Sequence, residues 1–339
     1  MLKLTYIVPA YNASASIQRT LDSIFSLPLS ESEYEVIVVD DCSTDDTLDV
    51  LAGMQKTHSN LIVFHQDTNQ RQGAARNRGV EKAKGKYIAF CDADDCIVVE
   101  GVMNVVKAVE NSNADICYFD YEYEHPKGEW HLCKTLPEFH NAILSSHDYL
   151  ENYYTCYYNA SWRSFYRAEF LREANIHFVE GVWWEDCDWT VKIYAKAKRI
   201  QFVEGVGYRY AFNEGATSKN RTPKAISERV YAGLRLMEYG KEIKTILPRL
   251  SQVLSDEGRC YYVIDTIRLR NLTKYSVKQI RELYSCLGEE RRVALSKYSW
   301  DTWESLFVNH KRVSLFLLFF FCPLAFVGRK VVRMVRKCC

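Results

Sequence analysis

Three carboxylates lie within four residues of this chain, at Asp92, Asp94 and Asp95. Like charges held so close together repel one another unless a cation lies among them. Carboxylate oxygens suit hard divalent cations, and Mg²⁺ in particular often binds one or two protein carboxylates together with substrate phosphates. We therefore predict that Asp92 and Asp94 bind a divalent cation next to a phosphate group. These residues alone leave open a solvated acidic turn in which Asp95 caps the next helix.

The acids follow an apolar run at residues 87–91, which is rich in strand-forming residues. Similar runs at residues 4–8, 35–39 and 61–64 predict three further strands, and the segment 17–25 repeats apolar residues at helical spacing. Strands that are apolar throughout and alternate with helices are typical of an open parallel α/β sheet.

Polar residues mark the carboxyl ends of these predicted strands. Pro9 and Tyr11 follow the first strand, Asp40 and Asp41 follow the second, and the acids at 92–95 follow the fourth. Ligands of such sheets bind outside the carboxyl ends of the strands. The sequence has no Gly-x-Gly-x-x-Gly after the first strand and no Gly-Lys-Ser/Thr loop, which disfavours a dinucleotide site and a P-loop enzyme.

Four blocks of sequence, in this order, resemble the signature of the inverting family 2 glycosyltransferases, which have the GT-A fold. The blocks are IVPAYN (7–12), VDDCSTD (39–45), GAARN (73–77) and FCDADD (90–95). A Glu-Asp pair at 185–186 continues the resemblance, which fades after about residue 220. Cys42 departs from the glycine that is usual in the family, so we expect a less tight turn there.

The resemblance implies a metal-dependent glycosyltransferase of the hexosyltransferase type. Its fold is the α/β GT-A nucleotide-diphospho-sugar transferase fold, in which a central, mostly parallel sheet is flanked by helices. We expect residues 1–220 to form this domain. From residue 221 apolar residues recur at helical spacing, which predicts a helical appendage through residue 310. A basic and hydrophobic tail follows at 311–339.

By resemblance, the donor is a nucleotide-diphosphate sugar, and uracil is the expected base. Pro9 and Tyr11 are then expected to line the base and the ribose. Asp41, with Asp40 beside it, is expected to accept a hydrogen bond from the base. Helix capping and turn chemistry are the alternative role of this acidic pair.

The resemblance also places Gly73, Arg76, Asp92 and Ala93 at the donor. Arg76 is expected to approach the donor phosphates or to hold the carboxylate cluster, and a surface salt bridge, which is worth little, is the alternative. Asp94 is expected to be a direct ligand of Mn²⁺ or Mg²⁺, and Asp92 to contact the ribose or the metal. The cation would neutralise the diphosphate as it departs.

Glu185 and Asp186 form a second acidic centre. Inversion by a single displacement needs a base that takes the proton of the acceptor hydroxyl, on the face of the sugar opposite the leaving group. By resemblance we expect Asp186 to be that base and Glu185 to orient the acceptor or the loop. Asp188 is a competing candidate for the base. Stabilisation of a helix N-terminus is the alternative role of the acidic pair.

The tail contains an uncharged segment at residues 313–328. It is shorter than the roughly 20 residues that a helix needs to span a bilayer. Basic residues lie on both sides, beginning with Lys311 and Arg312, and they favour a helix in the cytoplasmic face of an anionic membrane over a spanning helix. A buried core helix is the alternative. Peripheral attachment to the cytoplasmic membrane would suit a glycan or lipid-linked acceptor of bacterial surface-polysaccharide synthesis.

Composition narrows the function further. The formal net charge of +1 offers no basic field for nucleic acid. The 12 cysteines include no Cys-x-x-Cys pair, so we expect no zinc and interpret them as reduced thiols of a cytoplasmic protein.

A nucleotidyltransferase would use a similar sheet, but it would normally have a Gly-rich, basic loop after the first strand. A catalytically silent, membrane-bound scaffold of the same fold is the non-enzymatic alternative.

Overall fold

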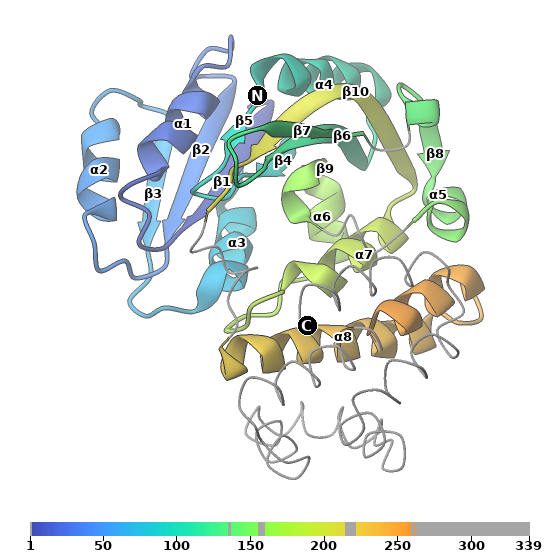
Figure 1. Cartoon of the computed structure of the whole chain (residues 1–339). Helices are drawn as coiled ribbons and strands as arrows, with labels where there is room; N and C mark the ends of the chain where they lie inside the picture. Colours follow the sequence, from blue (N-terminus) through green and yellow to red (C-terminus); the bar gives the residue numbers. More distant parts are fainter. Residues whose placement is uncertain (1, 135–136, 155–159, 214–221, 259–260, 262–339) are drawn as a thin grey trace. The chain divides into compact units, whose positions relative to one another are not determined.

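The computed structural model of this chain (Figure 1) describes residues 2–134, 137–154, 160–213, 222–258 and 261. The chain divides into two compact units, Met1–Lys219 and Asn220–Cys339. All of the candidate site residues belong to the first unit.

Strands and helices alternate through the first half of this unit, and its second half continues to mix the two. In the part of the chain described above, ten strands belong to one sheet. In chain order the elements are β1 (Leu4–Ala10), α1 (Ile17–Phe25), β2 (Tyr34–Asp40), α2 (Thr47–Met54), β3 (Leu61–His65), α3 (Arg71–Lys82), β4 (Tyr87–Phe90), β5 (Cys96–Ile97), α4 (Val99–Ser112), β6 (Ile116–Glu124), β7 (Trp130–Cys133), η1 (Pro137–Phe139), β8 (Ile143–Ser145), α5 (Ser146–Asn152), η3 (Ser161–Arg163), β9 (Ser164–Arg167), α6 (Ala168–Ala174), α7 (Asp186–Lys196) and β10 (Arg199–Tyr210).

One half of the sheet is parallel, with β3, β2, β1 and β4 as neighbours in this order. Leu4 of β1 lies opposite both Tyr34 of β2 and Tyr87 of β4, so these three strands start level with one another. Because they also run in the same direction, their carboxyl ends lie together at one edge of the sheet. The predicted parallel sheet is therefore confirmed for these four strands, and their shared edge carries the polar residues identified from the sequence.

The other half of the sheet mixes strand directions. β9 lies between β4 and β6 and is antiparallel to both, whereas β6 and β10 are parallel. A hairpin joins β6 to β7, and Gly128 in its turn has a φ of +80°. β10 is a single strand, and its pairing with β6 is irregular between Val203 and Val206.

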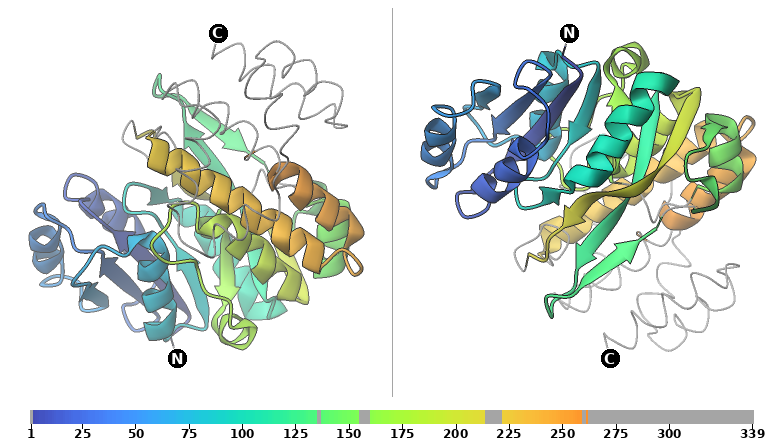
Figure 2. Two further views of the ribbon diagram at one scale, coloured as in Figure 1. Left: turned by 90° about the horizontal axis from the view of Figure 1, so that it is seen from below. Right: turned by 90° about the horizontal axis from the view of Figure 1, so that it is seen from above.

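Helices cover both faces of the sheet, with α4 over one face and α3 over the other (Figures 1 and 2). α3 packs closely on β1, since a Cβ at Gly79 would lie 2.4 Å from the side chain of Ile7. Gln70, immediately before α3, donates its backbone N–H to Oδ1 of Asp41 at 2.7 Å. The first turn of α3 therefore lies at the carboxyl edge of the sheet.

Of the second unit, the structure describes residues 222–258 and 261. Helix α8 (Pro223–Glu242) starts after Thr222, whose side chain accepts a hydrogen bond from the N–H of Ala225. The predicted tail at 311–339 lies outside the described residues. Across those that are described, no helix combines the length and the apolar character needed to cross a bilayer.

Candidate active site

The acidic loop, residues 91–95, follows β4 at the carboxyl edge of the sheet. The N–H of Asp95 donates to the carbonyl oxygen of Asp92 at 3.1 Å. The Asp95 carboxylate is buried and accepts hydrogen bonds from the hydroxyl of Tyr208 at 2.6 Å and from the N–H of Ala211 at 2.8 Å. Since α4 begins only after β5, the alternative in which Asp95 caps this helix is wrong.

Arg76, on α3, joins the acidic loop to the second acidic centre. Its Nη2 donates to Oδ1 of Asp92 at 2.7 Å, and its Nη1 forms an ion pair with Oε1 of Glu185. Nε2 of Gln72 donates to the other carboxylate oxygen of Glu185 at 3.1 Å. Arg76 is 2% exposed and Glu185 is 0% exposed, so their charges are balanced by each other rather than by water. Acids from remote parts of the chain therefore meet at one site, and Arg76 holds them there.

The charges at this site perturb the guanidinium of Arg76. Burial by itself would lower its pKa, but the negative charges of Asp92, Glu185 and Asp186 raise this pKa above its usual range. Arg76 thus remains a cation among three carboxylates.

Asp186 is the first residue of α7 and lies beside this ion pair. Burial, together with the negative charge of Glu185, raises its pKa to about 8, although the positive charge of Arg76 acts in the opposite direction. A carboxylate with a pKa near the working pH is well suited to take a proton from a hydroxyl group. Asp188, by contrast, is 2% exposed and forms an ion pair with Lys192 at 2.8 Å, one turn along the same helix.

The segment that leads to Glu185 is held by α3. Asn77 uses both ends of its amide: Oδ1 accepts from the N–H of Phe178 at 2.8 Å, and Nδ2 donates to the carbonyl oxygen of the same residue at 2.9 Å. A Cβ at Gly73 would lie 2.5 Å from the carbonyl oxygen of Val179. Glycine therefore allows the helix and the segment to approach closely, which accounts for Gly73 without a donor contact.

Asp40 and Asp41 lie at the carboxyl end of β2, next to the end of β1. Asp40 is fully buried, and its Oδ2 accepts from the N–H of Ser43 at 3.1 Å and contacts Nδ1 of His65 at 2.8 Å. The bond from Ser43 is the turn chemistry that the sequence left open. Oδ1 of Asp41 accepts from Nε2 of Gln66 at 2.7 Å, in addition to the backbone N–H before α3, and burial raises the pKa of this carboxylate.

The remaining residues expected at the donor lie along the same edge. Pro9 is buried within β1, whereas Tyr11, just beyond the strand, is 50% exposed. Ala93 is buried, and its carbonyl oxygen accepts from the hydroxyl of Thr20 at 2.9 Å. Cys42 has a φ of +65°, which is the left-handed backbone conformation that favours glycine.

Asp92 and Asp94 are the candidate metal ligands. Oδ2 of Asp94 accepts from Nδ2 of Asn213 at 2.7 Å, and burial raises the pKa of this carboxylate, with a further contribution from Asp92. Among the described residues, no group of three or more His, Cys, Asp or Glu side chains could hold a metal ion. Two carboxylates nevertheless fit Mg²⁺ or Mn²⁺, because such ions complete their coordination with substrate phosphates and water.

The sequence alone indicated no role for Gln72, Asn77, Tyr208 or Asn213. Asn77 belongs to the GAARN block, so the motif itself was a signal. Tyr208 and Asn213 offered none, because they contact the acidic loop across 116 and 119 positions of sequence respectively.

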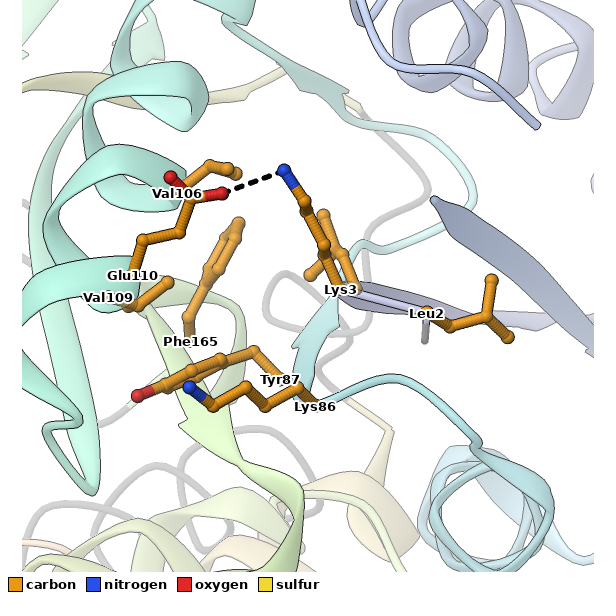
Figure 3. Close-up of a pocket in the computed structure, with 9 residues that line it drawn as sticks. Leu2, Lys3, Lys86, Tyr87, Val106, Val109, Glu110 and Phe165 are labelled. Carbon is orange, nitrogen blue, oxygen red and sulfur yellow. Dashed lines mark hydrogen bonds and ion pairs between the residues drawn. The ribbon is translucent and has the colours of Figure 1, made fainter. Parts of the chain in front are cut away.

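A separate pocket of about 160 Å³ lies at the amino ends of β1 and β4 (Figure 3). Its lining is mostly apolar, and Nζ of Lys3 donates to Oε1 of Glu110 at 2.7 Å beside it. Leu4 and Tyr87, the first residues of the two strands, also line it. The pocket is therefore at the opposite end of these strands from the acids, and it is distinct from the candidate active site.

Residues 5–174 match the sequence profile of "Glycosyl transferase family 2". The chain belongs to this family. Among the curated relatives, it is 26% identical over 221 residues to the uncharacterized glycosyltransferase YibD of Escherichia coli, which is 64% of this chain and 63% of that protein. It is 30% identical over 215 residues to TarS of Staphylococcus aureus, a poly(ribitol-phosphate) β-N-acetylglucosaminyltransferase, which is 62% of this chain and 36% of that protein. The chain thus spans less than two thirds of the length of either relative.

Solved structures agree with the family on the fold. A structure of TarS residues 1–349 in complex with UDP-GlcNAc has a TM-score of 0.60 and 22% identity and covers 92% of each chain. The mannosyltransferase PcManGT of Pyrobaculum calidifontis, in complex with GDP-Man and Mn²⁺, has a TM-score of 0.53 and 18% identity and covers 90% of this chain and 84% of that one. The GT-A fold implied by the sequence resemblance is confirmed.

Proposed function

We propose that this chain is an inverting, metal-dependent glycosyltransferase that moves a sugar from a UDP-linked donor to a hydroxyl group of a glycan or lipid-linked acceptor in bacterial surface-polysaccharide synthesis. The observation that carries this proposal is the ion-pair bridge of Arg76, which brings Asp92 and the second acidic centre to one site. Membership of family 2 and the relation to poly(ribitol-phosphate) glycosyltransferases support the reaction class.

The donor base is bound at the ends of β1 and β2. Tyr11 and Pro9 line the base and the ribose, and the exposed ring of Tyr11 offers an apolar wall. Asp41 accepts a hydrogen bond from the base, which suits the N–H of uracil because an ionised carboxylate can only accept. The complexes of TarS with UDP and UDP-GlcNAc support uracil as the base.

The diphosphate is bound at the acidic loop. Asp92 and Asp94 would hold Mn²⁺ or Mg²⁺, which neutralises the leaving diphosphate when it is bound. The Mn²⁺ in the mannosyltransferase structure supports a divalent cation. Arg76 keeps one oxygen of Asp92 in place, and Asn213 does the same for Asp94.

Asp186 is the base of the displacement. The acceptor oxygen attacks the anomeric carbon, the bond from that carbon to the diphosphate oxygen breaks, and the hydroxyl proton passes to the Asp186 carboxylate. Attack opposite the leaving group inverts the anomeric configuration. Glu185 is already paired with Arg76, and Asp188 with Lys192, which leaves Asp186 as the base with a raised pKa.

The rest of the chain fits the same proposal. Residues 1–220 form the transferase domain, and 221–310 form a helical appendage. The tail at 311–339 attaches the protein peripherally to the cytoplasmic membrane, where lipid-linked acceptors are found. Its uncharged segment between basic flanks supports this arrangement.

The test is thermal unfolding of the full chain with a panel of UDP-, GDP- and dTDP-sugars, with and without MnCl₂ or MgCl₂. We expect UDP-sugars to raise the Tm, and to raise it further with the cation, because a ligand that binds the native state stabilises it, by about 2.7 kcal/mol at 100 times its Kd. A panel in which no UDP-sugar stabilises the protein would contradict the proposal. Stabilisation without turnover of the bound donor would instead identify a catalytically silent scaffold.

A further inference from the structure

The hydroxyl of Tyr208 touches the acidic loop at two points. It accepts a hydrogen bond from the backbone N–H of Asp92 at 3.1 Å and donates one to Oδ2 of Asp95 at 2.6 Å. Tyr208 belongs to β10, so a strand from the far half of the sheet contacts both ends of the loop that carries the candidate metal ligands.

Asp95 is itself held on both oxygens. Its side chain is 1% exposed, and its second oxygen, Oδ1, accepts from the backbone N–H of Ala211 at 2.8 Å. One of these bonds leads to β10 and the other to the residue just after it, so Asp95 fastens the acidic loop to this part of the chain. This contact explains a third buried acid in the loop without making it a metal ligand.

The ring of Tyr208 has little freedom to move its hydroxyl. It is 1% exposed and stacks on Trp162, with the ring centroids 4.2 Å apart and the ring planes at 9°. Shortly after Tyr208 on the same segment, Nδ2 of Asn213 donates to Oδ2 of Asp94. The end of β10 and the residues just after it therefore contact the backbone or side chain of every acid in the loop.

We propose that Tyr208 is a positioning residue for the divalent cation: by bonding Asp92 and Asp95 together, it holds the Asp92 and Asp94 carboxylates in the geometry that the cation needs. The inference rests on the proposed function. Mg²⁺ demands near-ideal octahedral geometry at about 2.0–2.1 Å, so a small displacement of the loop is costly. Removal of an outer hydrogen-bond partner of a ligand typically lowers metal affinity by about 10–100-fold.

The experiment compares Tyr208→Phe with Tyr87→Phe in the full chain. Tyr87 is a matched control, because it is also buried, lies in β4 itself, and donates its hydroxyl to the carbonyl oxygen of Ala114 at 2.9 Å, away from the loop. Mn²⁺ binding is measured from the electron paramagnetic resonance signal of the free ion, with saturating UDP present. UDP binding without metal is measured by calorimetry.

We expect Tyr208→Phe to weaken Mn²⁺ binding about 10-fold and to leave metal-free UDP binding unchanged. Tyr87→Phe is expected to lower the Tm by about as much as Tyr208→Phe does, but to leave the Mn²⁺ affinity unchanged. If Tyr208→Phe does not fold, Asp95→Asn serves as the second variant, since it keeps the side-chain shape, and the same loss of Mn²⁺ affinity is expected.

Equal Mn²⁺ affinity in wild type, Tyr208→Phe and Asp95→Asn would overturn the inference while leaving the proposed function intact. If the wild-type protein binds UDP but no Mn²⁺, the metal-dependent function fails, and the positioning role fails with it. The two failures are therefore distinguishable.

Discussion

Replacement of Arg76 by methionine tests the bridge on which the candidate site depends. The guanidinium is 2% exposed and pairs with Asp92 and with the fully buried Glu185. Removal of one partner from a buried ion pair costs about 3–5 kcal/mol, because an uncompensated charge remains. We expect Arg76→Met to lower the free energy of unfolding by this amount at pH 8. A loss of that size is a large part of the roughly 5–15 kcal/mol that stabilises a typical domain.

The loss should depend on pH, and its sign follows from Asp186. Arg76 lowers the pKa of Asp186, which is nevertheless raised to about 8 by burial and by Glu185. A carboxyl group with a folded-state pKa above its unfolded value of about 3.9 stabilises the fold below the unfolded pKa, and this contribution is lost as the pH rises towards the folded pKa. Without Arg76 the pKa of Asp186 rises further. The destabilisation should therefore be smaller at pH 5 than at pH 8.

Urea unfolding followed by far-UV circular dichroism at both pH values measures this effect. Arg167→Met is the matched control, because Arg167 also joins two carboxylates, those of Asp115 and Glu169, each at 2.6 Å, but outside the site. Because Arg167 lies outside the candidate site, we expect the Arg167→Met control to retain UDP binding. An Arg76→Met variant within about 0.5 kcal/mol of wild type, the range of ordinary surface substitutions, and equal at both pH values, would refute the reasoning.

Four further predictions concern catalysis, the metal and the membrane. Asp186→Asn should leave donor binding intact and lower transfer by about 10²–10⁴-fold, whereas a near-normal rate would move the base to Asp188. In the wild type, kcat/KM should rise as the pH passes through about 8 and Asp186 loses its proton; a flat profile from pH 6 to 9 would contradict this role. Asp94→Ala should abolish Mn²⁺-dependent UDP binding in calorimetry, and unchanged affinity would argue against a metal ligand. Deletion of 311–339 should end co-sedimentation with anionic vesicles, and continued sedimentation would disprove the anchor.

Local patterns in the sequence predicted the strands that carry the proposed donor site. Continuous apolar runs ending at Pro9, at Asp40 and before Asp92 indicated parallel strands, and the structure places these ends together. This prediction succeeded because a continuous apolar run, and the polar residues at its end, can be recognised from neighbouring residues alone. Local patterns left the role of Asp95 open, because an acid that follows a strand can be either a helix cap or a buried anchor.

The order of the strands in the second half of the sheet was beyond such patterns. β9 inserts antiparallel between β4 and β6, although it follows β6 in the chain. Strand order depends on which faces pack best once the whole chain has collapsed. No periodicity within one strand records that choice.

The sequence by itself therefore determined the family, the parallel half of the sheet and the acids that do the proposed chemistry. The tertiary structure alone decided which of these acids are bound to which partner: Arg76 to Asp92 and Glu185, and Tyr208 to Asp95. The physical reason is that a buried charge or hydroxyl must find its partner in space, and here these partners lie 16 to 113 positions apart along the chain.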